Sequence, residues 1–525
     1  PTGGGLGMLA IGAGGIDVAI AMGTGLFHLA VPKVVRIVLE GKLGAWVSAK
    51  DVILKVIETF STKGNVNCVF EYSGPGLKHL DVPERATIAN MGAECGGTSS
   101  VFPSDAETKR FLEAQGRGPL WRELVADDDA EYDKSVVIDL DEIEPLAARP
   151  HSPDNIATIT SLNGTKVDQV MIGSCTNSSY RDLKMVARIL EGRRVHPDVS
   201  LGLAPGSRQV VSMLAKEGLL SIILASGARL LENACGFCIG NSMSPPTSGV
   251  SLRTSNRNFE GRSGTQSAKV FLVSPEIAAV AAIFGRIVDP RTMDEVKYPR
   301  VTMPKSFEID DSMFEKPPVD RKSVKIVKGP GIGAVPVAKP LPASIAGVAA
   351  IKVGDKITTD HIMPAGQRLK YRSNIEAYSR FVFENTDKDF AERAAKNRDE
   401  GLFNFIIAGE SYGQGSSREH AAMCPMFLGV KVVVAKSIER IHFANLVNFG
   451  IIPLSFANPA DYDKISLGDK LNIVGIGEAI AGEGKAMVKN DTKGVNIPVK
   501  VKLSERQKAI LVAGGLLNYA KTNAQ

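Results

Sequence analysis

An apolar run at residues 167–172 leads through a short polar loop into an amphipathic pattern at residues 179–190. This strand–loop–helix order is the feature that most restricts the fold. In the loop, Thr176, Asn177 and Ser178 are residue types that cap the N-termini of helices. Such a unit is typical of an open parallel sheet, in which ligands collect at the carboxyl ends of the strands. We therefore expect an α/β protein with a site at Cys175, which directly follows the strand.

The same alternation of short β-rich runs and helical patterns divides the chain into five segments. Residues 312–342 are rich in Pro, Lys, Gly and Val, which predicts an extended, semi-rigid linker between two bodies that can move relative to each other. We expect the remainder of a first α/β domain, a second and a third α/β domain, this linker and a further α/β domain, with bounds at 1–32, 33–150, 151–311, 312–342 and 343–525.

Composition excludes several classes of protein. The net charge of +5 is small for 525 residues, and the sequence has no dense basic tract. No nucleic-acid partner is therefore expected. No apolar run is long enough to predict a transmembrane helix, so no membrane association is expected. Six cysteines are too few for a disulfide framework. They favour a reducing compartment, and we expect a cytoplasmic location. Cys68, Cys95 and Cys424 stand in apolar or small-residue settings, where buried, inert thiols are expected.

The other three cysteines form the most informative pattern. Cys175 follows its strand, and Cys235 and Cys238 form a Cys-x-x-Cys pair. Three thiolates are one ligand short of a closed metal site, and an open metal position is where a substrate binds. None of the seven histidines stands beside the pair, and there is no second pair nearby. We therefore favour an iron–sulfur cluster over a zinc site and over structural or redox cysteines.

A polar segment at residues 254–262 contains two arginines five residues apart. Arg257 and Arg262, separated by Asn, Phe and Gly, suit a loop that presents guanidinium groups to carboxylates. The alternative is a solvated charged turn. Asn256 is a candidate neighbour of the cluster or of a substrate hydroxyl group.

Glycine-rich and polar loops in the C-terminal segment add candidate groups. A predicted strand at 403–408 is followed by the tight loop Gly413–His420, where glycines allow close backbone approach and Arg418 adds positive charge. This loop lacks the third glycine of a dinucleotide fingerprint and is no Walker loop. The alternative is two N-cap serines on an ordinary helix. Asp360 and Arg372 lie in two further polar loops.

Two residues near the N-terminus complete the set of candidates. Asn90 and Glu94 are four residues apart, hence on one face if this segment is helical. On its own this pair is weak support for a site.

Taken together, these motifs resemble the aconitase family of iron–sulfur hydro-lyases, and the resemblance covers essentially the whole chain. Seven motifs occur in the family's order, at residues 3–7, 90–94, 173–180, 235–240, 256–262, 358–362 and 415–421. The resemblance implies a three-domain α/β core around an iron–sulfur cluster, its first domain incomplete here, plus a linked α/β swivel domain that closes the active site.

The resemblance also implies roles for the candidate residues. Cys175, Cys235 and Cys238 would bind three irons of a [4Fe–4S] cluster and leave the fourth iron to the substrate. Substrate carboxylates would be bound by a set of arginines and a serine: Arg257, Arg262, Arg372, Arg418 and Ser417. Ser416 matches the family's catalytic base, and Asn256 would lie beside the cluster. Three further polar groups would support the active site: Asn90, Glu94 and Asp360.

The implied activity is that of an aconitate hydratase of the tricarboxylic acid cycle, which interconverts the small tricarboxylates citrate and isocitrate. The alternative within the family is a homoaconitate or 3-isopropylmalate isomerase, since the segment at 254–262 is equally typical of those relatives. A cluster-free RNA-binding regulator is a further alternative, which the charge pattern does not support. The complete protein is expected to be a monomer.

One departure from the family concerns the first residues. The family's Asp-Ser-His-Thr motif directly precedes the loop that opens this chain, and further acid–base residues lie upstream of it. We therefore expect that the natural N-terminal part is missing and that this polypeptide alone has very low hydratase activity. Full turnover of citrate would contradict this expectation.

Overall fold

The computed structural model describes residues 2–62, 64, 65, 67–364, 366–414 and 418–523. Their contacts divide the chain into two compact units. Unit 1 contains residues 1–12 and 30–317, and unit 2 contains residues 13–29 and 318–525. The division does not test the five domain bounds expected from the sequence, which stay a prediction. It does divide residues 1–32, which we expected to belong to one domain, between the two units.

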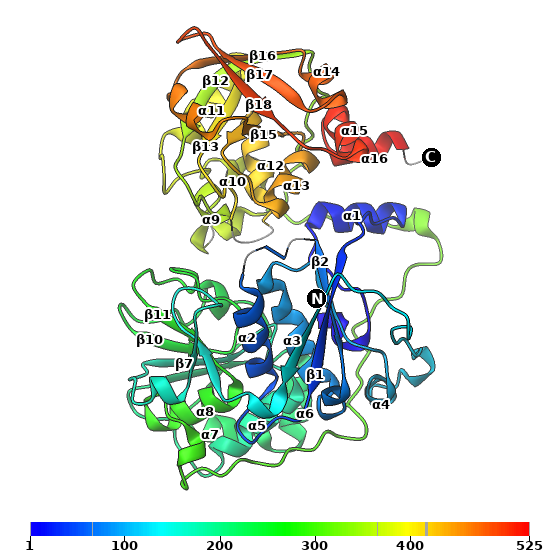
Figure 1. Cartoon of the computed structure of the whole chain (residues 1–525), viewed down its shortest axis with the longest axis vertical. Coiled ribbons are helices and arrows are strands. Elements are labelled where there is room, and N and C mark those ends of the chain that lie inside the picture. Colours follow the sequence, from blue (N-terminus) through cyan, green and yellow to red (C-terminus); the bar gives the residue numbers. More distant parts are fainter. Residues whose placement is uncertain (1, 63, 66, 365, 415–417, 524–525) are drawn as a thin grey trace. The chain divides into compact units, whose positions relative to one another are not determined.

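The first sheet of unit 1 is four-stranded and entirely parallel, in the order β3-β2-β1-β4. Its strands are β1 (Lys33–Glu40), β2 (Cys68–Ser73), β3 (Ser99–Val101) and β4 (Lys134–Asp139). Three α-helices accompany them: α2 (Ala49–Phe60), α3 (Val82–Met91) and α4 (Ala106–Ala114) (Figure 1). Ser48 caps α2, and Asp51 completes a capping box in the first turn.

The second sheet of unit 1 has seven strands in the order β6-β5-β11-β10-β7-β8-β9. Strands β11 to β9 are parallel neighbours, and β5 pairs antiparallel with both β11 and β6. The strands are β5 (Leu146–Ala148), β6 (Ile156–Thr158), β7 (Gln169–Gly173), β8 (Ser200–Ala204), β9 (Arg229–Leu230), β10 (Val250–Arg253) and β11 (Lys269–Leu272). The helices are α5 (Tyr180–Leu190), α6 (Arg208–Lys216), α7 (Leu219–Ala225) and α8 (Pro275–Phe284).

The strand–loop–helix unit that we used to predict the fold is present as β7 and α5. One detail of the prediction is wrong, because the N-cap of α5 is Ser179 and not Thr176, Asn177 or Ser178. Ser179 forms a capping box with Asp182. The three earlier residues are thereby left to shape the loop that carries Cys175.

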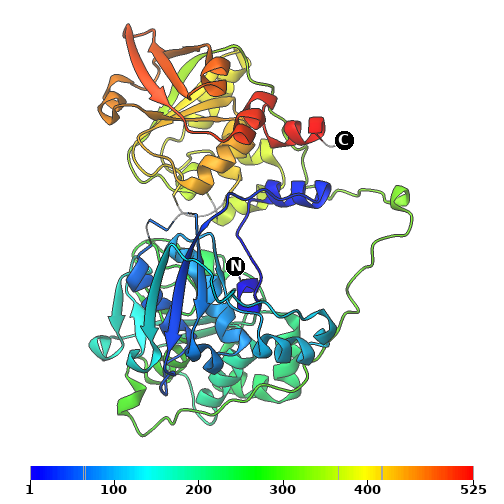
Figure 2. The same ribbon diagram turned by 45° about the vertical axis from the view of Figure 1, so that its right-hand side comes forward.

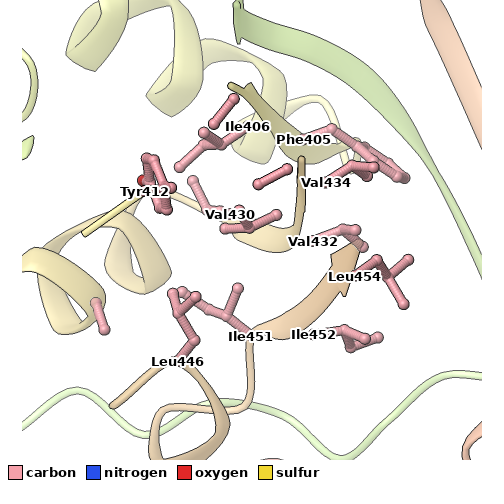
Figure 3. Packing of buried hydrophobic residues seen from close by; sticks show 14 of the residues in the cluster. Phe405, Ile406, Tyr412, Val430, Val432, Val434, Leu446, Ile451, Ile452 and Leu454 are labelled. Atoms are coloured by element: carbon pink, nitrogen blue, oxygen red, sulfur yellow. The ribbon is translucent and has the colours of Figure 1, made fainter. Parts of the chain in front are cut away.

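Unit 2 is built on a closed seven-stranded barrel, in the order β12-β13-β14-β15-β18-β17-β16. Its strands are β12 (Ser344–Lys352), β13 (Phe403–Ala408), β14 (Val430–Ala435), β15 (Ile452–Phe456), β16 (Lys470–Val474), β17 (Lys485–Asn490) and β18 (Val495–Lys500). The first four are parallel, and the others are joined by antiparallel pairing. Figure 3 shows apolar side chains of β13, β14 and β15 packed together in the core. Closure of the barrel leaves no free sheet edge.

The α-helices of unit 2 are α1 (Gly15–Thr24), α9 (Thr359–Ile362), α10 (Ile375–Ser379), α11 (Phe390–Asp399), α12 (His420–Phe427), α13 (Arg440–Asn448), α14 (Ile476–Ala481), α15 (Glu505–Ala513) and α16 (Leu516–Asn523). Helix α1 is anchored by Glu419, whose Oε1 accepts a hydrogen bond of 2.6 Å from the backbone N–H of Ile16. None of the described helices is long and apolar enough to span a membrane.

Short 3-10 turns complete the described structure. They are η1 (Thr2–Leu6), η2 (Pro75–His79), η3 (Gly92–Cys95), η4 (Gly118–Leu120), η5 (Leu140–Glu142), η6 (Thr160–Leu162), η7 (Phe237–Ile239), η8 (Pro290–Thr292), η9 (Arg321–Ser323), η10 (Gly366–Tyr371) and η11 (Pro459–Lys464). In the fully described stretch 293–343, η9 is the only regular element, so the segment expected to be a linker is largely extended chain (Figure 2).

Candidate active site

Cys175 lies at the carboxyl end of β7, where the sequence predicts it. The loop turns sharply there, because Gly173 and Ser174 both have positive φ angles, of 103° and 94°. At Gly173 a side chain would collide with the backbone carbonyl of Ala204, so glycine is required at this turn. The thiol of Cys175 is exposed beyond the strand end and lies 3.7 Å from the hydroxyl of Thr176. The turn therefore presents the thiol at the edge of the sheet where ligands bind.

The pair Cys235 and Cys238 lies on a loop of the same unit. Cys238 is part of η7, whose Phe237 is buried, and all three candidate cysteines are free thiols. Burial raises the pKa of Cys235, and the negative charges of Cys175 and Cys238 raise it further. Arg262 acts in the opposite direction. The fold thus brings the three cysteines, distant in sequence, into one electrostatic neighbourhood.

The other three cysteines are only partly as expected. Cys95 and Cys424 are fully buried, and burial raises both pKa values, that of Cys95 to about 12. Cys68, at the first position of β2, is only half-buried, which differs from our expectation. Its position at the start of the strand leaves its side chain partly open to solvent.

Three free cysteine thiols are a donor set that suits a sulfur-ligated cluster. Among the described residues, no three His, Cys, Asp or Glu side chains converge closely enough to hold one metal ion. In a cluster, each cysteine binds a different iron, so the three sulfurs need not meet at one point. The segments that carry these residues also hold buried polar atoms without a hydrogen-bond partner in the described structure: Asn177 Oδ1, Ser255 Oγ, Arg262 Nε and Ser263 Oγ. Unpartnered buried polar atoms are rare and fit a site that a polar group fills.

A chain of side-chain hydrogen bonds lies beside Cys175. The amide of Asn256 donates to Oδ1 of Asn90 at 2.6 Å, and its oxygen accepts from the hydroxyl of Thr176. Asn90 in turn donates to the hydroxyl of Thr2 at 2.6 Å. The amide nitrogen of Asn256 is 4.0 Å from the sulfur of Cys175. Thr2, Asn90, Asn256 and Thr176 thus form one hydrogen-bonded chain beside Cys175.

Glu94 and Arg257 form an ion pair across unit 1. The Nε–H of Arg257 donates to both carboxylate oxygens of Glu94, at 2.9 and 3.1 Å, and the carboxylate raises the pKa of Arg257. Glu94 does not share a helix face with Asn90 as supposed, because α3 ends at Met91 and Glu94 lies in η3. Because the 3-10 turn η3 follows α3, the Glu94 side chain reaches Arg257.

The second group of candidates lies in unit 2, around the glycine loop after β13. Gly413 has a φ of 84°, and the backbone N–H groups of Gly413 and Gln414 both donate to the carbonyl of Ile357. This pairing brings α9 next to Arg418, which donates 2.6 Å and 2.7 Å hydrogen bonds to Asp360 Oδ1 and the Met363 carbonyl. Asp360 therefore lies in a short helix and not in the polar loop that the sequence predicts. Ser416 and Ser417 lie outside the described residues.

Arg372 is brought to the same loops through His420. The backbone carbonyl of Arg372 accepts a 2.9 Å hydrogen bond from Nε2 of His420, while the guanidinium of Arg372 is exposed. Burial lowers the pKa of His420, and the charges of Arg418 and Arg372 lower it further. The imidazole is therefore neutral at pH 7, and its hydrogen bond holds the backbone at Arg372 in place.

Sequence reasoning missed several of these contributors. His420 begins a helix and Thr2 follows the first residue of the chain, and neither position carries a local signal of its role. The role of Glu419 is equally hard to predict from the sequence, because its partner Ile16 is separated from it by 403 residues. Only the pairing of distant segments makes these residues neighbours.

Comparison with known proteins agrees with this picture. Residues 1–285 match the aconitase family (aconitate hydratase), and residues 351–459 match the aconitase C-terminal domain. The probable mitochondrial aconitate hydratase of Caenorhabditis elegans is 35% identical, over 99% of this chain and 74% of its own length. The mitochondrial homocitrate dehydratase of Saccharomyces cerevisiae is 34% identical, over 99% and 75%. The mitochondrial aconitate hydratase of the same yeast is 34% identical, over 93% and 70%.

These relatives correct one expectation. All three are named as mitochondrial proteins, which contradicts the cytoplasmic location that we inferred from cysteine usage. Free cysteines indicate a reducing compartment, and the cytoplasm is only one such compartment. Both the ordered motifs and the multi-domain α/β fold are confirmed, and the chain belongs to the aconitase family.

Proposed function

We propose that this chain is an aconitate hydratase, which interconverts citrate and isocitrate through cis-aconitate by dehydration and rehydration. The observation that carries the proposal is the grouping in unit 1 of three free cysteines with the Asn90–Asn256 pair and Arg257. A hydro-lyase must expel a hydroxyl group, a poor leaving group, and must hold a highly charged substrate. The grouped residues supply ligands for the first task and cations for the second.

Cys175, Cys235 and Cys238 are the residues that would hold a [4Fe–4S] cluster with one iron not ligated by the protein. When bound, such a cluster supplies a Lewis acid for the departing hydroxyl group. Asn256, whose amide nitrogen is 4.0 Å from the Cys175 sulfur, would orient the polar groups at this position. Asn90 holds Asn256 in place by accepting its hydrogen bond.

The arginines would bind and orient the carboxylates of the substrate. Arg257 is held by Glu94 through Nε alone, so its two terminal nitrogens stay available as donors. The Nε of Arg262 is buried and without a protein partner among the described residues, so a substrate carboxylate or a bound cluster would improve its surroundings. Fixing several carboxylates at once lowers the entropic cost of reaching the reactive geometry.

Unit 2 would supply the base and further carboxylate contacts. Ser416 would remove the proton next to a carboxylate, which requires that nearby N–H groups and Arg418 stabilise its alkoxide. Asp360 holds Arg418 in the orientation described above, at a hydrogen-bond distance of 2.6 Å. Ser417, Arg418 and the exposed Arg372 would bind carboxylates. We further propose a mitochondrial location, as in the relatives' names, and a monomeric state.

The ratio of turnover rates on three substrates tests the proposal. The chain is incubated anaerobically with iron and sulfide, and turnover of citrate, homocitrate and 3-isopropylmalate is followed by ultraviolet absorbance of the unsaturated product. A ratio does not depend on the absolute activity of the preparation. Preference for citrate supports the proposal, and preference for either of the others replaces it with that isomerase.

A further inference from the structure

Two fully buried cations of unit 1 lie against the loops of the candidate site, and the proposed chemistry uses neither. The first is Lys50, the second residue of α2, with no exposed surface. Its Nζ donates to the carbonyl of Ser255 at 3.1 Å and lies 3.4 Å from the sulfur of Met91. Both of these partners are uncharged. A cation in the first turn of a helix is also opposed by the helix dipole.

The second cation is Arg253, the last residue of β10, which is also fully buried. Its Nη1 donates to the carbonyl of Phe237 at 2.6 Å, between Cys235 and Cys238. Its other nitrogens donate to uncharged groups, the Ser251 hydroxyl and the Gln169 side-chain oxygen, both at 3.0 Å. An arginine in such surroundings is normally paired with a carboxylate.

Burying a cation among neutral partners is unfavourable, so charged groups beyond the direct partners of these two side chains must offset the cost. Burial lowers the pKa of Lys50 to about 8, and of the anions that oppose this effect, the thiolate of Cys175 acts most strongly, ahead of Asp51. Burial lowers the pKa of Arg253 to about 10, opposed by the thiolate of Cys238. Both side chains remain charged at pH 7. For Lys50 the opposing anions also include Asp182 and Glu94, with Cys175 the strongest of them, and for Arg253 the opposing anion is Cys238.

The two cations also touch the backbone of the site at complementary places. The Ser255 carbonyl precedes Asn256, and Met91 follows Asn90, so Lys50 lies behind the pair of asparagines. Arg253 holds the turn of the Cys-x-x-Cys loop. One cation thus supports the Cys175 side of the site and the other supports the Cys238 side.

We propose that Lys50 and Arg253 are positioning residues of the cysteine site, which hold its loops and balance the negative charge of the group bound there. The proposal rests on the proposed function, in which three thiolates more than offset the positive charge of an iron–sulfur core. Without that group, the site carries two buried positive charges beside three thiols. An anion approaching the thiols should therefore be favoured over a neutral molecule of the same shape.

Alkylation of the full chain without added iron measures this preference. Rates for iodoacetate, an anion, and iodoacetamide, its neutral analogue, are compared at one fixed pH, with peptide mass spectrometry to assign each cysteine. The ratio of the two rates cancels the fraction of thiolate and reports the local potential. Lys50→Gln and Arg253→Gln remove the charges but keep a hydrogen-bond donor. Lys55→Gln is the matched control on α2, because Lys55 is exposed and pairs with Glu58.

The expected results differ by position. Lys50→Gln should lower the iodoacetate-to-iodoacetamide ratio at Cys175 about threefold, and Arg253→Gln should lower it about threefold on the peptide with Cys235 and Cys238, as expected for one unit charge several ångströms away in partly aqueous surroundings. Lys55→Gln should leave both ratios unchanged. Unchanged ratios in both variants, or an equal fall in the control, would overturn the proposal. Because the variants report on different cysteines, misfolding of one, detected by circular dichroism, leaves the other as the test.

Iron and sulfide content after anaerobic reconstitution distinguishes failure of the proposed function from failure of the role proposed for Lys50 and Arg253. If the unmodified chain takes up no cluster while the ratios fall, the cofactor of the proposed function is refuted and the two cations keep their role toward anions. If the chain takes up a cluster and the ratios do not change, this inference fails and the proposed function stands. Lower cluster content in Lys50→Gln, but not in Lys55→Gln, supports both.

Discussion

The ion pair between Glu94 and Arg257 offers the most direct test of how the site is built. Glu94→Gln keeps the size of the side chain but removes the charge that fixes Arg257. The side chain of Glu94 is 8% exposed and that of Arg257 is 31% exposed, so the pair lies between the buried and surface classes. Hydrogen bonds to charged groups contribute about 1.5–3 kcal/mol each when buried. Because Arg257 is nearly a third exposed, screening reduces this contribution, and we expect about 1.5 kcal/mol for the pair.

A double-mutant cycle isolates that value. The free energy of unfolding is measured by urea denaturation for the unmodified chain, Glu94→Gln, Arg257→Met and the double variant. We expect a coupling energy of about 1.5 kcal/mol, because each single variant leaves the other partner unpaired. The pair Glu107–Arg110, on one turn of α4 with the arginine 62% exposed, serves as control, with an expected coupling below about 0.5 kcal/mol.

The same variants test the role of Arg257 in binding. If Glu94 acts by holding Arg257 toward the substrate, Glu94→Gln should raise the KM for citrate about tenfold, the equivalent of about 1.4 kcal/mol, with a smaller change in kcat. A coupling energy no larger than that of the control pair would refute the reasoning. So would an unchanged KM in a variant whose coupling is lost.

Three further predictions concern stability. Burial raises the pKa of Glu276 from 4.5 to about 7, so between these pH values only the folded state holds the proton, and the contribution of this group to the unfolding free energy falls by about 3 kcal/mol as pH rises. Because Glu84 and Asp51 are also buried with raised pKa values, Glu276→Gln should reduce the slope in pH-dependent urea titrations by this amount and not remove it. Gly413→Ala should destabilise by about 3 kcal/mol, because φ is 84° and the ring of His442 occupies the place of the new methyl group. Gly401→Ala, with φ of 81° but open space, should cost only about 1 kcal/mol in the same denaturation assay. Glu419→Ala should release the N-terminus of α1 and speed hydrogen exchange at residues 15–24, whereas Glu419→Gln, which keeps an acceptor, should not.

Much of the local structure could be read from the sequence because it depends on neighbours along the chain. The strand Phe403–Ala408 has the expected bounds, since a run that is apolar except for Asn404 and is followed by glycines favours a strand. Asp51 lies in the first turn of α2, because a carboxylate there satisfies free N–H groups. The N-cap of α5 was misplaced because Thr176, Asn177, Ser178 and Ser179 are nearly equal in capping preference.

Long-range pairing decided what the local patterns left open. The Asn90–Asn256 and Glu94–Arg257 contacts join segments 166 and 163 residues apart, and no local signal encodes them. Lys50 is a comparable case, because its sequence environment resembles any helix start, and only packing shows that it is buried behind the site. Its role depends on the Ser255 carbonyl and the Met91 sulfur, which belong to distant segments.

The sequence by itself determined the α/β class, the family and the residues that carry its motifs, because these are stored in residue order and spacing. Only the tertiary structure decided which of those residues share a neighbourhood. It placed the three cysteines together, assigned Ala13–Leu29 to the unit that holds Arg418, and buried Lys50 and Arg253 against the cysteine loops. The physical reason is that burial and charge balance depend on contacts made through space, and a pattern along the chain cannot specify which distant segments will provide them.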